Sequence, residues 1–339
     1  MYREFNVAIV GATSVIGNEI LRVLEERKFP LKELRLFAAE DLEEGFLEFA
    51  GEDILVQKLS RDALAGIDIV LFADDGELSR QYAPVAVAAG AVCVDASSAW
   101  RLDPEVPLVV PEVNPDSIGL YGRKGIVASP DGAAIQMLVA LNPLHAAVGI
   151  RRVVVSTYQA VSGSGQSAID ELRIQTGELL NGRPGENKVY PHQIAFNCLP
   201  QTDDFLPNGY SKQEVQLIEE TRKVLADDTL QVTATTVRVP VFYGHSESIN
   251  IETGKKVSAA EATALLAAAP GLQVVDDVQR GGYPMPIDVA GQDLVLVGRI
   301  REDESTANGL NLWVVADNLR KGAATNAVQI AEILAAKYL

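Results

Sequence analysis

The sequence predicts a two-domain α/β protein, and three observations carry this prediction. The chain opens with an apolar run, a glycine turn and apolar residues at helical spacing. Apolar strands then alternate with helices, which indicates a parallel sheet covered on both faces. From residue 152 onward, longer runs alternate polar and apolar residues, which is typical of an antiparallel or mixed sheet with one open face. At 339 residues the chain is long enough for two domains.

The first turn, GATSVIG at residues 11–17, follows the apolar run Phe5 to Val10 and precedes a helix. Such a unit places backbone N–H groups and a helix N-terminus where a pyrophosphate can bind. Gly11 would give the tight turn, and Gly17 would allow close helix packing. The middle position of the glycine pattern is Ser14, so nucleotide binding and a bare structural turn both fit this motif. With the strands that follow, it predicts a Rossmann-like domain.

Further strands are expected at residues 34–38, 67–73 and 91–95, with a helix over 77–89. Ligands bind at the carboxyl ends of such strands. Glu40 and Asp41 follow the second strand, where an acidic group can bind the ribose hydroxyls of NAD but repels the 2'-phosphate of NADP. Asp74 and Asp75 follow the next strand and would face a pyrophosphate with like charge. A solvated acidic rim explains these residues equally well.

The segment ASPDGAAIQ at 128–136 is the centre of the predicted site. An apolar run reaches a Pro-Asp-Gly turn there, and a helix is expected from about 133 to 144. Asp131 suits the N-cap of that helix, because its carboxylate can accept hydrogen bonds from the first free amides. The second domain, residues 132–317, would then carry five polar-apolar strands at 152–160, 231–241, 248–253, 294–301 and 310–316. Residues 318–339, which include a final helix over 323–338, would return to the first domain, residues 1–131.

Composition narrows the functional classes. The net charge of -17 argues against nucleic acid and anionic membranes, because both need clusters of Lys and Arg. No apolar stretch is long enough to span a bilayer and no signal peptide is visible, so a cytoplasmic protein is expected. Two cysteines make no disulfide framework, and three dispersed histidines predict no metal site.

Long motifs resemble the aspartate-semialdehyde dehydrogenases over essentially the whole chain. They are GATSVIG at 11–17, VVPEVN at 109–114, IQMLVALNPL at 135–144, VSTYQAVSGSG at 155–165, IAFNCLPQ at 194–201, RVPVFYGHSESINIET at 238–253, VGRIR at 297–301 and WVVADNLRKGAATNAVQIAE at 313–332. The resemblance implies a Rossmann-like domain, an α+β domain that also forms a homodimer interface, and a role linked to amino-acid biosynthesis.

In this family a cysteine thiolate attacks the aldehyde, hydride passes to NADP, and inorganic phosphate cleaves the thioester. By motif position, His245 resembles the general acid/base and Gln159 the glutamine that orients the substrate. Arg238 resembles the arginine that binds the substrate carboxylate, and Arg101 the arginine that helps hold phosphate and substrate. The same resemblance gives the candidate cofactor-binding residues Gly11, Thr13, Ser14, Val15, Gly17 and Asn318.

At the nucleophile position the chain departs from the family. The cysteine position is Gly132, which has no side chain for a covalent adduct, and the preceding asparagine is Asp131. Ser129 would need a positioned base to replace the thiol, and a rescue by this residue is not expected. Cys198 falls on a packing position of the motif, so a buried structural thiol is expected there.

Three further departures concern phosphate and cofactor. The family's Glu-x-x-Lys pair, which helps bind substrate and phosphate, is Gln213 and Gln216. The run that clamps the 2'-phosphate of NADP is replaced by residues 39–42, which include Glu40 and Asp41, so NADP is disfavoured and NAD stays possible. The small loop near the nicotinamide is replaced by residues 73–76.

Together these changes predict a pseudoenzyme: a homodimer that keeps the fold, lacks the phosphorylating dehydrogenase activity, and acts as a binding or interaction protein. A small carboxylate metabolite is the expected ligand, bound through Arg238, His245 and Gln159. The alternative is an NAD- or NADP-dependent oxidoreductase with an altered mechanism.

Overall fold

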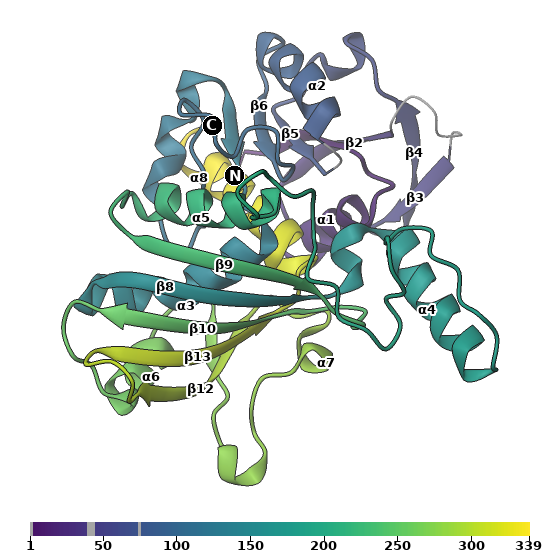
Figure 1. The fold of residues 1–339 in the computed structure, drawn as a ribbon. Helices are drawn as coiled ribbons and strands as arrows, with labels where there is room; N and C mark the ends of the chain where they lie inside the picture. The colour runs from purple at the N-terminus through teal and green to yellow at the C-terminus, as the bar shows by residue number, and fades with distance from the viewer. Residues whose placement is uncertain (1–2, 39–44, 74–75) are drawn as a thin grey trace. The chain divides into compact units, whose positions relative to one another are not determined.

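The computed structural model describes residues 3–38, 45–73 and 76–339 (Figure 1). Contacts within the chain divide it into two compact units. Unit 1 comprises Met1–Asp131 and Ala323–Leu339, and unit 2 comprises Gly132–Gly322. Each unit is built on its own β-sheet, and the predicted α/β fold class, with a Rossmann-like domain and a second domain, is confirmed.

Over its described residues, the sheet of unit 1 has seven strands in the order β3-β4-β2-β1-β5-β6-β7. All neighbouring pairs are parallel except β3 and β4. The β5 and β6 strands are fully buried, as expected for the middle of a covered parallel sheet. The strand bounds are β1 Phe5–Val10, β2 Leu31–Ala38, β3 Gly45–Phe49, β4 Glu52–Lys58, β5 Ile69–Phe72, β6 Val92–Asp95 and β7 Ile126–Ala128.

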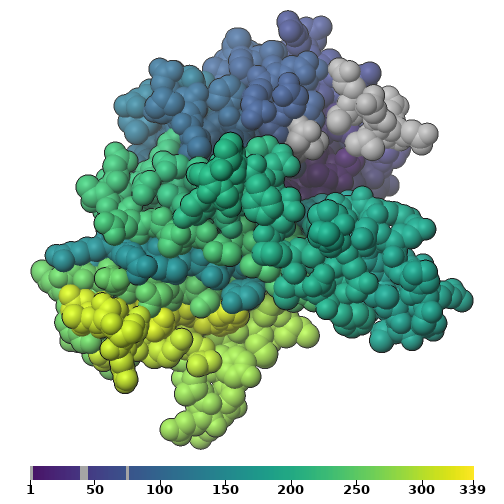
Figure 2. Space-filling model, viewed as in Figure 1, coloured from purple at the N-terminus to yellow at the C-terminus, as the bar shows by residue number. Residues whose placement is uncertain are grey.

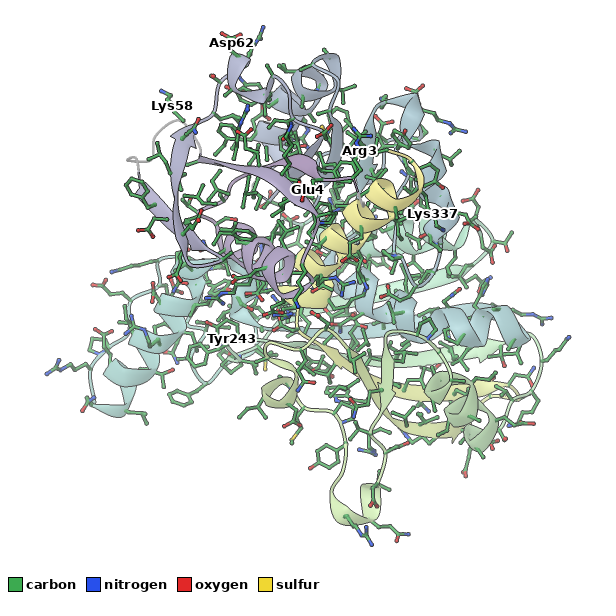
Figure 3. All side chains as sticks on the ribbon, turned by 180° about the vertical axis from the view of Figure 1, so that it is seen from behind. Arg3, Glu4, Lys58, Asp62, Tyr243 and Lys337 are labelled. Carbon is green, nitrogen blue, oxygen red and sulfur yellow. The ribbon has the colours of Figure 1, made fainter. Side chains whose placement is uncertain are left out.

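The helices of unit 1 pack on this sheet through apolar faces. The α1 and α8 helices contact each other, and the buried residues of both belong to one hydrophobic core with β1 and β5. Arg3, just before β1, donates a hydrogen bond to the carbonyl of Leu339, and Figure 3 shows Arg3 and Lys337 at the same end of the unit. The helix bounds are α1 Val15–Glu26, α2 Gly76–Ala88 and α8 Thr325–Lys337, with 3-10 turns at Asp62–Leu64 and Pro115–Arg123.

The sheet of unit 2 has six strands in the order β11-β12-β13-β10-β8-β9. The β8–β9 and β11–β12 pairs are parallel and the other pairs are antiparallel, so the sheet is mixed. The bounds are β8 Ile150–Gln159, β9 Gln231–Arg238, β10 His245–Thr253, β11 Leu272–Val274, β12 Val295–Asp303 and β13 Gly309–Ala316.

One long helix, α3 (Gly132–Val148), contacts β8, β10, β12 and β13. It is apolar on almost every side, which is typical of a helix enclosed by its own unit. The segment between β11 and α7 projects from the sheet (Figures 1 and 2). No helix in the described part of the chain is long and apolar enough to cross a membrane. The other helices are α4 Gln166–Leu180, α5 Lys212–Leu225, α6 Ala259–Ala267 and α7 Pro286–Val289, with 3-10 turns at Val161–Ser164 and Val278–Arg280 and a π-helical turn at Arg320–Ala324.

The α4 helix holds the segment that follows it by two polar side chains. The Glu171 carboxylate accepts hydrogen bonds from the backbone N–H groups of Lys188, Val189 and Tyr190. Gln175 accepts from the amides of Ile194 and Ala195 at 3.1 and 3.2 Å. The irregular segment 188–195 is therefore held by hydrogen bonds from its backbone to these two side chains, and not by pairing with a β-strand.

Candidate functional site

The glycine turn of unit 1 has the geometry that a dinucleotide turn requires. Gly11 has φ +83°, which favours glycine. A Cβ on Gly17 would lie 2.1 Å from the Gly11 carbonyl oxygen, so the turn and the start of α1 touch directly. Ser14 caps α1: its hydroxyl accepts from the Gly17 N–H at 2.9 Å and donates to the Ala73 carbonyl at 2.7 Å. Serine at this position therefore joins the turn to the end of β5.

The same turn leaves amides available at the helix start. The N–H groups of Gly11 and Ala12 both donate to Phe37, whereas those of Thr13, Val15 and Ile16 have no backbone partner among the described residues. Such amides beside a helix N-terminus fit a pyrophosphate, and a dinucleotide bound there would supply the hydride acceptor. Glu40, Asp41, Asp74 and Asp75, on which the predicted choice between NAD and NADP depends, lie outside the described residues, so their roles stay predictions.

Arg101 is buried in unit 1, with 8% of its surface exposed. Its Nε donates to the Ser129 carbonyl at 3.0 Å and its Nη2 to the Ala96 carbonyl at 2.9 Å. Its Nη1 lies 3.7 Å from an Asp131 carboxylate oxygen. The arginine is thus a buried, internally bonded residue and not the exposed half of a surface ion pair.

Near Arg101 lies a second acid, Asp95 at the end of β6. Burial raises the pKa of Asp95, while hydrogen bonds from Ser79 and Ser97 and the charge of Arg101 oppose that rise in its pKa. The Ser97 hydroxyl donates to Asp95 at 2.8 Å, and the Ser79 hydroxyl donates to its other oxygen. Asp95 is therefore bonded within the fold through both oxygens.

At the predicted nucleophile position, Gly132 is the first residue of α3. A Cβ built on it would lie 3.2 Å from the carbonyl oxygen of Gly322, 3.4 Å from its Cα and 3.6 Å from the carbonyl oxygen of Asn318. Contacts of 3.2 Å are tighter than ordinary van der Waals contact, so any side chain at 132 would require the backbone around 322 to shift.

Gln159, Arg238 and His245 meet at one edge of the unit 2 sheet. Gln159 and Arg238 end the parallel strands β8 and β9 and are register partners. His245 begins β10, which runs antiparallel to β8 and therefore starts at the edge where β8 ends. All three are at least nine-tenths buried. The structure thus brings together three side chains that the sequence singled out.

The ring of His245 is neutral and has a fixed tautomer. Burial and the nearby charge of Arg238 lower the pKa of His245 well below 6.5. Its Nδ1 accepts a hydrogen bond from the Ala160 N–H at 3.2 Å, so the proton of the neutral ring is on Nε2. Arg238 donates through Nη1 to the Ala160 carbonyl at 2.8 Å. Ala160 therefore orients both side chains, and His245 presents a hydrogen-bond donor.

Gly163 lies against both of these side chains. A Cβ at this residue would be 2.9 Å from Nη1 of Arg238 and 3.2 Å from the His245 ring. Beside them, the buried Oε1 of Gln159 has no hydrogen-bond partner within the described chain, although its Nε2 donates to Thr157 at 3.2 Å. A buried, unpaired amide oxygen costs stability unless a ligand or water donates to it.

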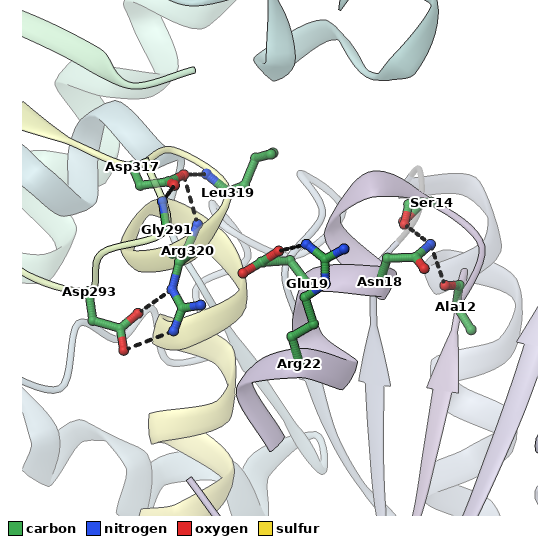
Figure 4. Close-up of polar contacts among 10 residues, drawn as sticks. All are labelled: Ala12, Ser14, Asn18, Glu19, Arg22, Gly291, Asp293, Asp317, Leu319 and Arg320. Carbon is green, nitrogen blue, oxygen red and sulfur yellow. Dashed lines mark hydrogen bonds and ion pairs between the residues drawn. The ribbon is translucent and has the colours of Figure 1, made fainter. Parts of the chain in front are cut away.

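Asn318, predicted to bind cofactor, is bonded inside unit 2. Its Oδ1 accepts from the Ser162 hydroxyl and from the Gly244 N–H, each at 3.1 Å. The neighbouring residue Asp317 accepts from the amides of Gly291, Leu319 and Arg320, as Figure 4 shows. These bonds fix the turn that faces Gly132.

Several residues that shape this site were not predicted from the sequence. Gly163, Gly322 and Gln136 were not singled out, yet the Gln136 amide donates to the His245 carbonyl at 3.3 Å. The glycine-containing stretches SGSG and RKG could have pointed to Gly163 and Gly322, because glycine often stands where another part of the chain or a ligand comes close to the backbone. The expectation of a buried Cys198 was wrong: it is exposed, because the next residue, Leu199, turns inward and bonds to the backbone of Arg238.

Gln213 and Gln216, which are expected at the positions of the family's charged pair, both lie partly buried on α5. Helix α5 begins with a capping box in which Ser211 and Glu214 exchange hydrogen bonds. Glu214 also accepts from the Thr236 N–H at 2.9 Å, which ties the helix to β9.

Comparison with known proteins gives the class of the chain. Residues 6–121 match the semialdehyde dehydrogenase NAD binding domain, and residues 141–321 match the semialdehyde dehydrogenase dimerisation domain. These two matches define a semialdehyde dehydrogenase-type protein.

Three similar proteins narrow this class. The aspartate-semialdehyde dehydrogenase of Aquifex aeolicus is 53% identical over 97% of this chain and 98% of its own length. That of Legionella pneumophila is 51% identical over 100% of this chain and 98% of its own. The crystal structure of aspartate semialdehyde dehydrogenase II from Vibrio cholerae has a TM-score of 0.97 and 48% identity, covering 99% of this chain and 100% of that chain. The chain belongs to the aspartate-semialdehyde dehydrogenase family.

Proposed function

We propose that this chain is a family member without the phosphorylating dehydrogenase activity, which binds a small carboxylate through unit 2. One observation carries the proposal: the first residue of α3, where the family's thiol is expected, is Gly132. Covalent catalysis requires a nucleophile, and glycine supplies none. Of the two cysteines, Cys93 is buried, which raises the pKa of its thiol, and Cys198 is exposed on another segment.

The cluster of Gln159, Arg238 and His245 supports the binding role. Arg238 supplies a positive charge, and His245 supplies a neutral Nε2–H donor that needs no proton from solvent. A carboxylate can accept from both, since charge-assisted hydrogen bonds are the stronger ones. The unpaired Oε1 of Gln159 can accept from a hydroxyl or ammonium group on the same ligand. The favoured ligand is a short carboxylate with one further donor group, such as an amino acid.

Restoring the thiol tests the enzymatic part of the proposal. Gly132→Cys, with Gly132→Ser as the matched control, is assayed for phosphate-dependent reduction of NADP and of NAD with aspartate semialdehyde. We expect neither variant to turn over, because the sequence predicts that Gln213 and Gln216 stand in place of the family's charged pair, and because the Gly322 carbonyl crowds the new side chain. Turnover by the cysteine variant alone would show that the rest of the site is intact, and turnover by the unaltered chain would refute the proposal.

Calorimetric titration with L-aspartate and succinate tests the binding part. We expect saturable binding that Arg238→Lys weakens at least about tenfold, because lysine cannot reproduce the planar donor pair of arginine. Arg151→Lys, which alters an exposed arginine at the other end of β8, is the control. If both variants bound the carboxylates with equal affinity, the carboxylate site would not include Arg238.

A second candidate is an oxidoreductase that uses NAD or NADP by an altered mechanism. The available amides at Thr13, Val15 and Ile16 favour it, because they suit a pyrophosphate. Parallel titrations with NAD and NADP decide the matter: saturable binding of either keeps this candidate, and absence of both removes it.

We also propose that the chain forms a homodimer through unit 2. The match of residues 141–321 to a dimerisation domain supports this. Light scattering after size exclusion should give twice the chain mass of 36.4 kDa, and a monomer at micromolar concentration would contradict the proposal.

A further inference from the structure

Tyr190 lies on the irregular segment that follows α4, and its ring and its hydroxyl differ in their surroundings. The ring packs against a small hydrophobic core of unit 2 whose members include Val161 and Leu199. The hydroxyl oxygen is buried and has no hydrogen-bond partner within the described residues. A buried, unpaired hydroxyl costs stability, so it calls for an explanation. Tyr190 therefore offers a donor that the fold itself does not use.

The core that holds Tyr190 also adjoins Arg238. Leu199 exchanges backbone hydrogen bonds with Arg238 at 2.9 and 2.8 Å. Val161 directly follows Ala160, whose carbonyl accepts from the Arg238 guanidinium at 2.8 Å. The packing of the Tyr190 ring therefore places it beside the residues that fix this arginine.

The polar group of Tyr190 also lies near Arg238. Burial raises the pKa of Tyr190, and the charge of Arg238 and the nearby Ser164 hydroxyl oppose that rise in its pKa. Ser164 directly follows Gly163, whose Cβ would lie 2.9 Å from Nη1 of Arg238. Because the effect of burial is the largest, the phenol stays protonated at neutral pH and can donate its proton to an acceptor.

The position of Tyr190 is fixed without a ligand. The buried Glu171 carboxylate on α4 accepts from the Tyr190 N–H at 3.4 Å and from the Lys188 N–H at 2.7 Å. A donor that is already held in place loses little conformational freedom when a ligand binds.

We propose that Tyr190 is a further ligand-binding residue of unit 2, whose hydroxyl donates a hydrogen bond to the carboxylate bound by Arg238. This inference rests on the proposed carboxylate-binding function. The ligand would then meet three donors, from Arg238, His245 and Tyr190. One ionised carboxylate can accept from all three, because its two oxygens together offer about four acceptor sites.

The substitution Tyr190→Phe tests this, since it keeps the ring and removes the hydroxyl. L-aspartate and succinate are titrated into the full chain at pH 7.5 and followed by calorimetry. We expect the variant to bind both at least about tenfold more weakly, which is the effect of one hydrogen bond to a charged group. Without ligand its melting temperature should stay the same or rise, because an unpaired buried hydroxyl is removed.

Tyr210→Phe is the matched control. The Tyr210 hydroxyl lies 3.1 Å from the Thr233 hydroxyl and is bonded to it, so its loss removes a hydrogen bond that the fold uses. This variant should keep the affinity of the unaltered chain for both ligands and melt at a slightly lower temperature.

The inference and the proposed function can fail separately. If Arg238→Lys weakened binding and Tyr190→Phe did not, the carboxylate site would stand and Tyr190 would not belong to it. A weaker affinity joined to a large fall in the melting temperature of ligand-free Tyr190→Phe would also overturn the inference, since the hydroxyl would then serve the fold. If the unaltered chain bound neither ligand, the proposed function would be refuted and the role of Tyr190 with it.

Discussion

A Cβ built on Gly132 lies 3.2 Å from the carbonyl oxygen of Gly322, and one built on Gly322 lies 3.1 Å from the Cα of Gly132. The two glycines therefore share one space between the start of α3 and the π-helical turn. We expect Gly132→Ala and Gly322→Ala each to cost up to about 1 kcal/mol of unfolding free energy, through overpacking. The double variant should cost at least about 0.5 kcal/mol more than the sum, because neighbouring substitutions couple.

Urea denaturation of the four proteins measures this coupling. Gly177→Ala in α4, where a Cβ meets no atom within 4 Å, should not destabilise the protein and serves as the control. If the losses of unfolding free energy from the two single substitutions simply added in the double variant, the two glycines would not share one space.

Gly163→Ala should disturb ligand binding more than folding. The added methyl group would meet the end of the Arg238 side chain at 2.9 Å and the His245 ring at 3.2 Å, and a side chain can move where a backbone cannot. We expect carboxylate affinity to fall at least about tenfold, the effect of losing one charge-assisted hydrogen bond. Calorimetry and thermal melting together test this. A large loss of stability with unchanged affinity would mean that Gly163 only serves packing.

His245 should make the protein less stable at mildly acidic pH. Its folded pKa is lowered well below 6.5, so the unfolded chain binds the proton more tightly and the unfolding free energy falls as pH drops below about 6.5. Between pH 7.5 and 5.5 the loss should be about 1 kcal/mol. His245→Gln should lack this part of the pH dependence, whereas His192→Gln, at an exposed histidine, should keep it. If the unfolding free energy changed with pH in the same way in all three proteins, His245 would not be the source of this pH dependence.

Gly17→Ala should strongly destabilise unit 1, because its Cβ would lie 2.1 Å from the Gly11 carbonyl oxygen and 2.8 Å from the Cα of Ala12. Both contacts are with backbone, and a cost of about 3 kcal/mol follows from overpacking of this severity. Gly45→Ala, where a Cβ meets nothing within 4 Å, is the control. If Gly17→Ala unfolded at the same urea concentration as the unaltered chain, the turn would be able to move apart without a loss of stability.

Much of the fold could be predicted because the periodicity was strong. The buried runs of β1, β5 and β6 and the alternating strands β8, β10 and β13 lie within a few residues of their predicted places. The β3–β4 pair was not predicted, since these two partly exposed strands at one side of the sheet lack a continuous apolar pattern. Helix α5 was also not predicted, although Ser211 and Glu214 have the spacing of a capping box, which can be recognised in a sequence.

The site was harder to predict than the fold. Motif positions pointed to Gln159, Arg238 and His245, and the strand register brings them to one edge. Their roles stay predictions. The sequence could not show that Asp131 faces Arg101, or that Gly132 faces Gly322, because both relationships depend on three-dimensional proximity of residues about 30 or more positions apart.

The exposure of Cys198 also makes the protein well suited to spectroscopy. The chain has two cysteines, and Cys93 is enclosed in the first sheet. A maleimide dye should therefore attach at a single place without any engineering. Leu199, the next residue, exchanges backbone hydrogen bonds with Arg238 at 2.9 and 2.8 Å. A fluorophore on Cys198 would therefore sit one residue from the backbone partner of Arg238, so its emission should change in real time when the proposed carboxylate binds to Arg238.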